Sequence, residues 1–403
     1  MNSLAPISSG DRIEIIDIIR GFAILGIFLV NMGDFHSPWL YLEVGKLWTS
    51  PIDIGADIFV DIFAQSSFYT LFSFLFGFGM VIIKERMTAL NYSFYKLFLR
   101  RMFWLLVFGL IHAFLIWHGD ILISYAGIGL LLLIFHKAKP RTLLIFAFSI
   151  IAFSVFIIGR RLLLIELSYP YEISRYYPEM VEKSLYVYGS GSYLEITSQR
   201  ITDWLAVSGG NGFLYLTAAI LPMFLLGAFA AKKKIFENLE ENYYFIKNVW
   251  LGSLIVGFGF KLMPYIIGQG ITVDYLQGAI GGPATAIFYA SSIILMSRKA
   301  FWQRKLRFFA AVGRLSLSNY LFQSIVGTLI FYSYGLGLYG KVSPFFGLLL
   351  VAGIYTIQVL LSKWWIARFR IGPVEWLWRS LTYGSRQKFR RVRDDNSRLR
   401  EVN

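Results

Sequence analysis

The sequence predicts an all-α protein, a polytopic membrane bundle of about ten transmembrane helices with both termini in the cytoplasm. Three observations predict this fold class. First, 56% of the 403 residues are hydrophobic, only 16% are charged, and the mean hydropathy is +0.58. A water-soluble domain would have to expose much of that apolar excess. Second, apolar runs of about 18 residues or more recur along the chain. Third, basic residues gather in alternate loops between these runs.

Ten apolar runs are the expected spans. They cover residues 16–32, 58–83, 97–117, 121–135, 143–158, 212–231, 250–267, 280–296, 315–332 and 345–365. The fourth and fifth runs are short for a span. Acidic residues precede the first run, where a cleavable signal peptide would need plain positive charge, so we expect this run to be retained as a helix.

The basic residues of the short loops predict the orientation. With the N-terminus inside, the short outer loops contain little beyond Lys46 and Lys341. The cytoplasmic loops and tail then contain Lys84, Arg86, Lys96, Arg100, Arg101, Lys137, Lys139, Arg141, Lys232, Lys233, Lys234, Lys247, Arg298, Lys299, Arg304, Lys305, Arg307 and seven basic residues after 385. This asymmetry is the positive-inside pattern, and an even number of spans returns the C-terminus to the cytoplasm.

The sequence predicts one transmembrane domain with a long outer segment, followed by a basic tail. Residues 1–384 are expected to form a single transmembrane domain, which includes a tyrosine-rich outer segment, 159–211. A Gly-Ser-Gly-Ser break at 189–192 predicts two short amphipathic helices lying on the outer face. Residues 385–403 form a basic cytoplasmic tail. The net charge of +15 is therefore interpreted as attraction to anionic membrane lipids, with no nucleic-acid partner.

Cysteine is absent, which excludes disulfides and cysteine-ligated metal sites. No metal site is predicted. Ionisable groups at membrane depth are the functional candidates, because each is kept despite a cost of roughly 2.5–3.5 kcal/mol on insertion scales.

The first span carries polar groups at both ends. Asp17 and Arg20 share one helix face near the cytoplasmic end, and Asn31 lies near the outer end. Arg20 can anchor an anionic group such as a phosphate. The alternative is an interfacial ion pair with a snorkelling arginine. Gly21 and Gly26 make this helix smooth enough for close packing.

The outer end of the same helix reads "NMGDFHSPW". His36 follows Asp34 closely, so the carboxylate can orient the imidazole and raise its basicity. His36 is therefore a candidate base, and Asp34 and Asn31 are candidate substrate-binding residues. The alternative is a solvated loop histidine.

The next stretch, "SPIDIGADIFVDIFAQ", places Asp53, Asp57, Asp61 and Gln65 at four-residue spacing. On a helix these residues form one polar stripe that descends from the outer surface into the bilayer. Asp57 is a candidate catalytic neighbour of His36, and Asp61 is a candidate substrate-binding residue. The alternative is a stripe that only lines a wet crevice.

The stretch "LIHAFLIWHGDILISYAG" contains a second candidate cluster. His112 lies in the third span, His118 and Asp120 form the outer turn, and Tyr125 begins the return. His112 and Asp120 are candidate catalytic residues, and Trp117 and Tyr125 are candidate substrate-binding residues. We expect them to face the same outer vestibule as His36. The alternative for His112 is a hydrogen bond between helices.

Near the C-terminus, residues 372–384 read "GPVEWLWRSLTYG". Trp376 and Trp378, with Glu375 and Arg379 at i,i+4, predict a short interfacial helix under the bundle. We expect a structural role for it.

Five motifs carry a family resemblance. "DIIRGFAILGIFLVN", "FYTLFSFLFGFGM", "LIHAFLIWHGDILISYA", "GRLSLSNYLFQS" and "GPVEWLWRSLTYG" occur in this order. The set resembles the YeiB-like bacterial membrane proteins, domain-of-unknown-function family 418, over most of the chain. The biochemical role of that family is largely unassigned.

A more distant resemblance implies chemistry. The D-x-x-R-G opening, followed by a polar residue at the far end of the helix, resembles the transmembrane acyltransferase superfamily. The acyltransferase-3 branch has a histidine at the position of Asn31, so its base is missing here. The heparan glucosaminide N-acetyltransferase branch has asparagine there, then H-x-x-W and A-D-[IL], matched by His36-Ser-Pro-Trp39 and Ala56-Asp57-Ile58 at a different spacing. This resemblance implies that His36 is the acyl-accepting or base histidine, with Asp57 as its neighbour.

Two functions follow from the sequence. The first is an integral-membrane acyltransferase of the bacterial plasma membrane, with no permanently bound cofactor, acyl-CoA as donor substrate held by Arg20, and a sugar or amine acceptor at the outer face. The alternative is a proton-coupled small-molecule or lipid transporter that uses the aspartate stripe as a relay, with Lys261 beside Pro264 as a further hint. A receptor, scaffold or lipid-binding role and a homo-oligomeric state stay open.

Overall fold

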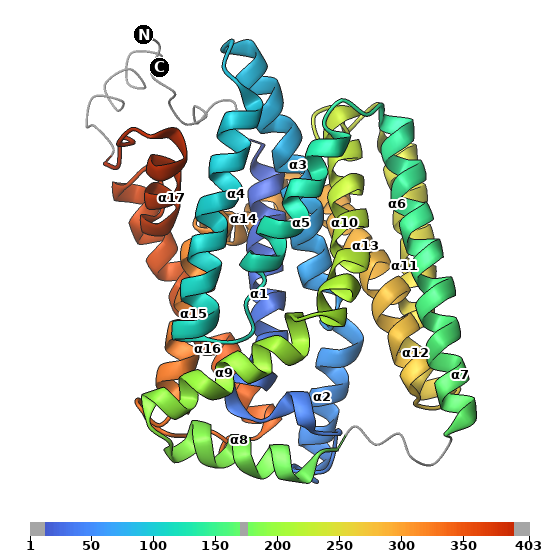
Figure 1. The fold of residues 1–403 in the computed structure, drawn as a ribbon. Helices are drawn as coiled ribbons and strands as arrows, with labels where there is room; N and C mark the ends of the chain where they lie inside the picture. Colours follow the sequence, from blue (N-terminus) through green and yellow to red (C-terminus); the bar gives the residue numbers. More distant parts are fainter. Residues whose placement is uncertain (1–12, 170–175, 391–403) are drawn as a thin grey trace.

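The computed structural model describes residues 13–169 and 176–390. Most of the predicted basic tail, residues 391–403, lies outside the described residues. Within the described ranges the chain forms helices and no strand; an isolated bridge joins Phe369 and Arg390. The long helices run side by side as one bundle (Figure 1).

The helices follow one another with short connections. They are α1 (Glu14–His36), η1 (Trp39–Tyr41), α2 (Pro51–Phe63), α3 (Ser67–Ala89), α4 (Phe94–Ile111), η2 (His112–Ile116), α5 (Leu122–Phe135), α6 (Pro140–Ser154), η3 (Val155–Gly159), α7 (Arg160–Ser168), α8 (Pro178–Ser190), α9 (Tyr193–Ser208), α10 (Asn211–Lys232), α11 (Tyr243–Ile266), α12 (Ile271–Leu276), η4 (Gln277–Gly281), α13 (Gly282–Ser297), α14 (Ala300–Arg314), α15 (Ser316–Phe331), α16 (Pro344–Arg368) and α17 (Pro373–Tyr383). η2, η3 and η4 are π-helical turns.

The apolar helices confirm the predicted all-α membrane bundle. The described ranges contain eight helical segments that are long and apolar enough to cross a membrane, and they overlap eight of the ten expected runs. The remaining two runs form the shorter helices α5 and α15. The number of crossings and the orientation stay predictions. Following that orientation, we name the end with the start of α1 and α17 the inner end, and the opposite end the outer end (Figure 1).

Helix α1 is in contact with α3, α13, α14, α15 and α16. A Cβ atom on Gly21 would lie 1.9 Å from the Phe309 carbonyl oxygen of α14, and one on Gly26 would overlap the Phe68 ring. The close packing predicted for these two glycines is therefore confirmed. Helix α14 was not expected, because its residues had been assigned to a cytoplasmic loop. Its apolar face packs on α1 and α16, and its basic residues lie on the other face.

The expected second span is broken in two. Ser66, with φ of 60°, separates α2 from α3. The break leaves carbonyl groups at the end of α2 without helical partners. The buried ammonium group of Lys261 in α11 donates hydrogen bonds to two of them, the backbone oxygens of Asp61 at 3.0 Å and Gln65 at 2.5 Å. Lys261 therefore closes a helix break at membrane depth.

The outer segment forms a lid of two helices. Helix α6 continues through η3 into α7, so the fifth span is longer than its apolar run suggested, and the outer segment proper begins after Ser168. α8 and α9, together named the outer cap, lie across the outer end of the bundle (Figure 1). The two predicted helices are thus confirmed, and the capping box of Ser192 with Glu195 starts the second one at the predicted break.

Replacing Gly21 with alanine tests the contact between α1 and α14. Its new methyl group would overlap the Phe309 carbonyl, and we expect a loss of about 1–3 kcal/mol from overpacking, seen as a lower melting temperature in detergent. Gly353→Ala in α16 is the matched control, because no atom lies within 4 Å of its added Cβ. That variant should melt at or above the wild-type temperature. Equal melting of the two variants would contradict the packing described.

Candidate functional site

A buried histidine and aspartate form a pair at the outer end. His112 is the first residue of η2, and Asp120 lies in the turn before α5. Nδ1 of His112 lies 2.9 Å from Oδ1 of Asp120, and both side chains are almost fully buried. Oδ2 of Asp120 accepts a hydrogen bond from the backbone N–H of Ile123 at 2.8 Å. Because the carboxylate accepts, Nδ1 carries the proton.

The second ring nitrogen of His112, Nε2, is buried and has no hydrogen-bond partner among the residues that the structure describes. In the neutral tautomer set by Asp120, this nitrogen presents a lone pair. The π turn contributes to this geometry: the Trp117 N–H donates to the His112 carbonyl five residues back, at 2.8 Å. π turns of this kind frequently occur at functional sites. The pair therefore has the arrangement of an oriented general base.

Trp117 connects the two histidine-containing sides of the site. Its buried ring lies 4.3 Å from that of Phe35 and 6.2 Å from that of His112, and its indole N–H has no hydrogen-bond partner. His36 follows Phe35 at the end of α1. It is 3% exposed, so the alternative of a solvated loop histidine is wrong.

Asp34 does not orient His36 as the sequence suggested. Within the described residues, Nδ1 of His36 is buried and has no hydrogen-bond partner. The His36 ring lies against Gly347 of α16, and its backbone oxygen accepts from Gly340 N–H at 2.7 Å. These contacts with α16 and with the loop before it fix His36 at the end of α1. Asp34 instead lines a small cavity with His118.

That cavity lies beneath the outer cap. It has a volume of about 10 Å³, about the room that one water molecule needs. Asp34, His118, Ser184 and Asp203 contribute polar groups to it. In the described part of the chain, neither ring nitrogen of His118 has a hydrogen-bond partner. Burial lowers the pKa of His118; the charge of Asp203 opposes this, and the charge of Arg200 adds to it. His118 is therefore neutral near pH 7.

Asp203 of α9 joins the two cap helices to each other and to η1. Its Oδ1 accepts from the Tyr41 hydroxyl at 2.6 Å and from Gln199 Nε2 at 2.8 Å, and its Oδ2 accepts from the Tyr188 hydroxyl at 2.6 Å. Burial and the hydrogen bond to Asp203 raise the pKa of Tyr41, so its hydroxyl stays a donor. One buried carboxylate thus joins η1, α8 and α9.

Arg200, on the adjoining turn of α9, is also buried. Its guanidinium donates to the Phe114 carbonyl at 3.4 Å and to the Tyr334 hydroxyl at 3.2 Å, and it lies 5.0 Å from the centre of the Tyr193 ring. Its Nε atom has no partner. Sequence reasoning missed Arg200 and Asp203, although a basic and an acidic residue three positions apart in an amphipathic outer helix were a usable signal.

Two predicted substrate-binding residues lie outside this site. The Tyr125 hydroxyl is bonded to Ser73 Oγ and to the Tyr69 carbonyl, both at 2.8 Å, within the main hydrophobic core. Asp61 accepts from Tyr265 at 2.8 Å and from Gln277 at 2.6 Å, beside Lys261. Its carboxylate belongs to the group formed by α2, α11 and η4.

The rest of the aspartate stripe is divided as well. Oδ1 of Asp53 accepts from Ser343 Oγ and from the Phe345 N–H, so Asp53 caps the start of α16. Asp57 is half-buried on α2, and no contact joins it to His36 among the described residues. Asn31 is half-buried on α1. The stripe is therefore not one continuous polar path.

The inner end carries a group of arginines. Arg20 lies 3.2 Å from Asp17, so the predicted ion pair is present. The Arg101 guanidinium stacks on Trp378 of α17, with 3.7 Å to the ring centre. Arg20 and Arg379 lie close enough to Arg101 for their positive charges to repel its charge. Three guanidinium groups thus lie near one another at the inner end, and guanidinium groups are suited to binding anions.

Helix α17 has the structural role expected of it. Glu375 is buried and accepts from the backbone N–H groups of Leu317 at 2.8 Å and Ser318 at 3.1 Å, which caps the start of α15. Across the part of the chain that the structure describes, no group of three or more histidine, cysteine or acidic side chains is arranged to hold a metal ion.

Comparison with known proteins places the chain among bacterial relatives. The family described as "Protein of unknown function (DUF418)" matches residues 230–385. The chain is 41% identical to the uncharacterized protein YxaH of Bacillus subtilis (strain 168), over 96% of this chain and 98% of that protein. It is 29% identical to the uncharacterized protein YeiB of Escherichia coli (strain K12), over 92% and 96%. An uncharacterized 39.9 kDa protein of Bacillus acidopullulyticus shares 27% identity over 94% and 96%. No solved structure matches.

Asp203→Ala tests whether this carboxylate holds the cap. The change leaves the Tyr41 and Tyr188 hydroxyls without their acceptor, at about 1–3 kcal/mol for each buried group. We expect faster amide hydrogen exchange in α8 and α9, by about tenfold or more, with exchange in α1 unchanged. Glu182→Ala, an exposed acidic residue of α8, is the control. Equal exchange in both variants would show that apolar contacts alone hold the cap.

Proposed function

Starting from the premise that the chain belongs to the DUF418 family, for which no function is described, we propose that it is an integral-membrane acyltransferase with its reaction centre at the outer end. The observation that carries this proposal is the buried His112–Asp120 pair, whose free nitrogen Nε2 presents a lone pair in a water-poor site. Asp120 orients the imidazole, and His112 acts as general base.

The reaction follows from this geometry. Nε2 of His112 takes the proton from the acceptor hydroxyl or amine, and the acceptor oxygen or nitrogen attacks the acyl carbonyl carbon. The thioester C–S bond breaks, and the thiolate that leaves takes up the proton. Arg200 supplies positive charge close to the outer site, where the negative charge of the tetrahedral intermediate develops.

The two ends of the bundle have separate roles in this proposal. The inner arginines, Arg20 and Arg101 among them, hold the phosphates of an acyl-CoA donor. The acceptor, a sugar or an amine, binds beneath the outer cap. Since the cavity there has room for about one water molecule, the cap must move before an acceptor enters. The bacterial plasma membrane is the proposed location, which agrees with the bacterial relatives.

His36 is the alternative base. The acyltransferase resemblance favours it, but its Nδ1 has no carboxylate partner, whereas His112 has one. His112 is therefore assigned the proton transfer, and His36 a position near the acceptor.

Labelled acetyl-CoA tests this proposal. Protein in liposomes is incubated with radiolabelled acetyl-CoA and glucosamine as acceptor, and label is counted in the sugar and in acid-quenched protein. We expect His112→Ala to reduce transfer by about 10²–10⁴-fold, and Asp120→Asn to reduce it with little change in acetyl-CoA affinity. His136→Ala removes a histidine at the inner end and should retain transfer. Absence of both transfer and acetyl-CoA binding in the wild type would refute the proposal.

A proton-coupled transporter is the second candidate. The observation that favours it is the polar group of Lys261, Asp61, Tyr265 and Gln277 at membrane depth, next to the π turn η4. Ionisable residues in such positions mark proton relays in transporters.

Proton flux separates the two functions. In liposomes with a pH gradient, the transport hypothesis expects flux coupled to solute movement in the wild type and its loss in Asp61→Asn. Asp53→Asn is the control for stability, since Asp53 caps α16 and has no place in the polar group around Lys261. Unchanged flux in Asp61→Asn would exclude the relay.

A further inference from the structure

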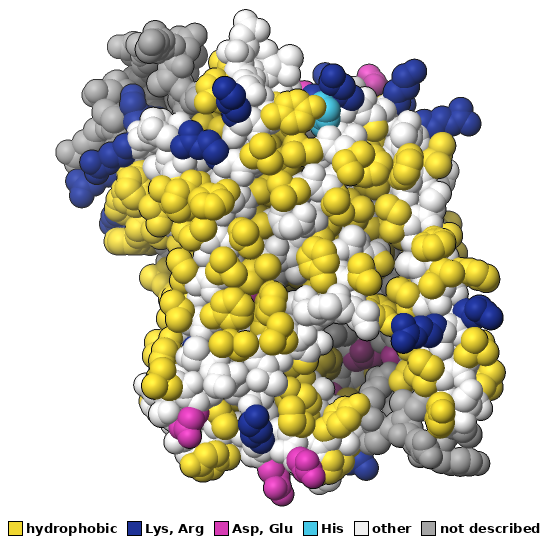
Figure 2. Space-filling view, viewed as in Figure 1, with side chains coloured by type: hydrophobic (Ala, Val, Ile, Leu, Met, Phe, Trp, Pro, Cys, Tyr) yellow, Lys and Arg dark blue, Asp and Glu magenta, His cyan; other side chains and the backbone are white. Residues whose placement is uncertain are grey.

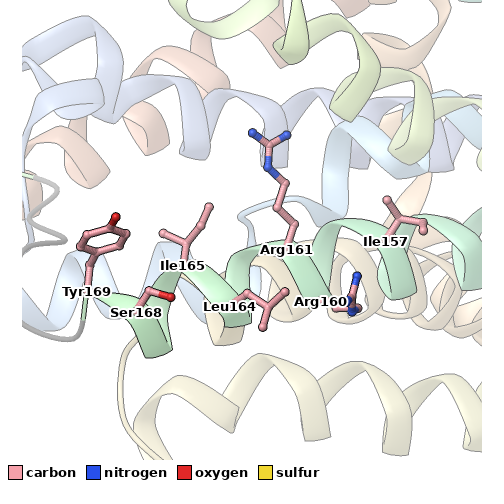
Figure 3. A pocket seen from close by; sticks show the side chains of 7 residues that line it. All are labelled: Ile157, Arg160, Arg161, Leu164, Ile165, Ser168 and Tyr169. Atoms are coloured by element: carbon pink, nitrogen blue, oxygen red, sulfur yellow. The ribbon is translucent and has the colours of Figure 1, made fainter.

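A hollow of about 420 Å³ lies beside η3 and α7 (Figure 3). Its wall combines aliphatic side chains, Ile157, Leu164 and Ile165, with the guanidinium groups of Arg160 and Arg161. Ser168 and Tyr169 add hydroxyl groups at one end. Figure 2 shows a recess on this side of the molecule, with an acidic side chain inside it and basic and apolar side chains along its edge. Neither the His112–Asp120 pair nor the outer cap contributes to this lining.

The depth of the two arginines follows from the helix. The continuous segment from Pro140 to Ser168 is the most apolar of the candidate spans. Arg160 lies twenty residues after Pro140, which corresponds to roughly 30 Å at 1.5 Å per residue. That rise equals the thickness of the bilayer hydrocarbon. Both guanidinium groups therefore reach the level of the lipid headgroups at the outer surface.

The two arginines have no internal partner in the part of the chain that the structure describes. Both side chains are exposed, and Arg161 extends from its helix across the hollow (Figure 3). The nearest carboxylate on α7, Glu166, points to α12, where its Oε2 accepts from the Thr272 N–H at 3.4 Å. Two unpaired guanidinium groups next to an apolar wall thus lie where phosphate groups are concentrated. Arginine binds phosphate with two parallel hydrogen bonds.

We propose that this hollow binds an anionic phospholipid of the outer leaflet. Arg160 and Arg161 bind its phosphate, an acyl chain lies along Ile157 on the membrane side of the arginines, and Leu164 and Ile165 line the headgroup side. The occupant is a lipid rather than a soluble phosphate, because the arginines lie at the headgroup level and Ile157, on their membrane side, is aliphatic and exposed. The proposal is independent of the acyltransferase assignment, since neither His112 nor Asp120 is part of the hollow.

Native mass spectrometry tests the site. Delipidated protein in detergent is mixed with equal amounts of phosphatidylglycerol and phosphatidylcholine carrying the same acyl chains. We expect retained phosphatidylglycerol to exceed phosphatidylcholine about tenfold in the wild type, and this preference to disappear in the Arg160→Gln/Arg161→Gln double variant. Ile165→Trp, which fills the hollow and keeps both charges, should reduce retention of both lipids.

A charge-matched control separates a site from general attraction. Arg304→Gln/Lys305→Gln removes the same charge from the exposed inner surface and should leave the preference unchanged. Equal loss in both double variants, equal retention of the two lipids by the wild type, or no retained lipid would each overturn the proposal. Circular dichroism of every variant establishes that the helices are intact. If the wild type retains phosphatidylglycerol selectively but neither transfers acetyl groups nor binds acetyl-CoA, only the acyltransferase assignment is refuted.

Discussion

Every backbone N–H and carbonyl group within the membrane needs a partner inside the protein, and this requirement organises the structure. Where helices are continuous, the helix itself meets it. Where they break or begin, charged side chains do so: Lys261 at the end of α2, Asp53 at the start of α16 and Glu375 at the start of α15. Several ionisable residues at membrane depth therefore maintain the fold. Their presence in an apolar segment does not by itself indicate chemistry.

The outer end differs because several of its buried polar atoms do not cap a helix. His36 Nδ1, His112 Nε2, both nitrogens of His118 and Arg200 Nε are buried without partners. Each such group costs about 1–3 kcal/mol. The aromatic cluster that includes Phe35, Trp117 and Tyr332 packs around them and offsets this cost. Unpartnered buried atoms also occur elsewhere among the described residues, such as Ser297 Oγ and Thr382 Oγ1, but the outer end gathers the imidazole and guanidinium nitrogens.

The sequence predicts the bundle well because span length and apolar character are local properties that the bilayer imposes. The helix break at 189–192 and the close packing at Gly21 could likewise be predicted from the sequence. Other features depend on distant partners. Helix α14 packs on α1, and the aspartate stripe is divided by contacts with α16 and η4. Asp34 lines one cavity with Asp203, which lies 169 positions later in the sequence. The spacing of residues along the chain does not reveal those partners. The types of residue in the site could therefore be predicted, but their pairing could not.

The way the cap is held bears on how an acceptor would enter the closed site in the proposed acyltransferase. Of the three short hydrogen bonds at Asp203, the one from Tyr41 of η1 attaches the cap to the bundle, and those from Tyr188 and Gln199 lie within the cap. Hydrogen bonds exchange readily for bonds to water or to a polar acceptor, so their net contribution is modest, about 0.5–1.5 kcal/mol each. A sugar or an amine that offers an equivalent donor could therefore replace the bond from Tyr41 at little net cost, whereas an apolar molecule could not. The attachment of the cap itself would then select for polar acceptors before any chemistry at His112 begins.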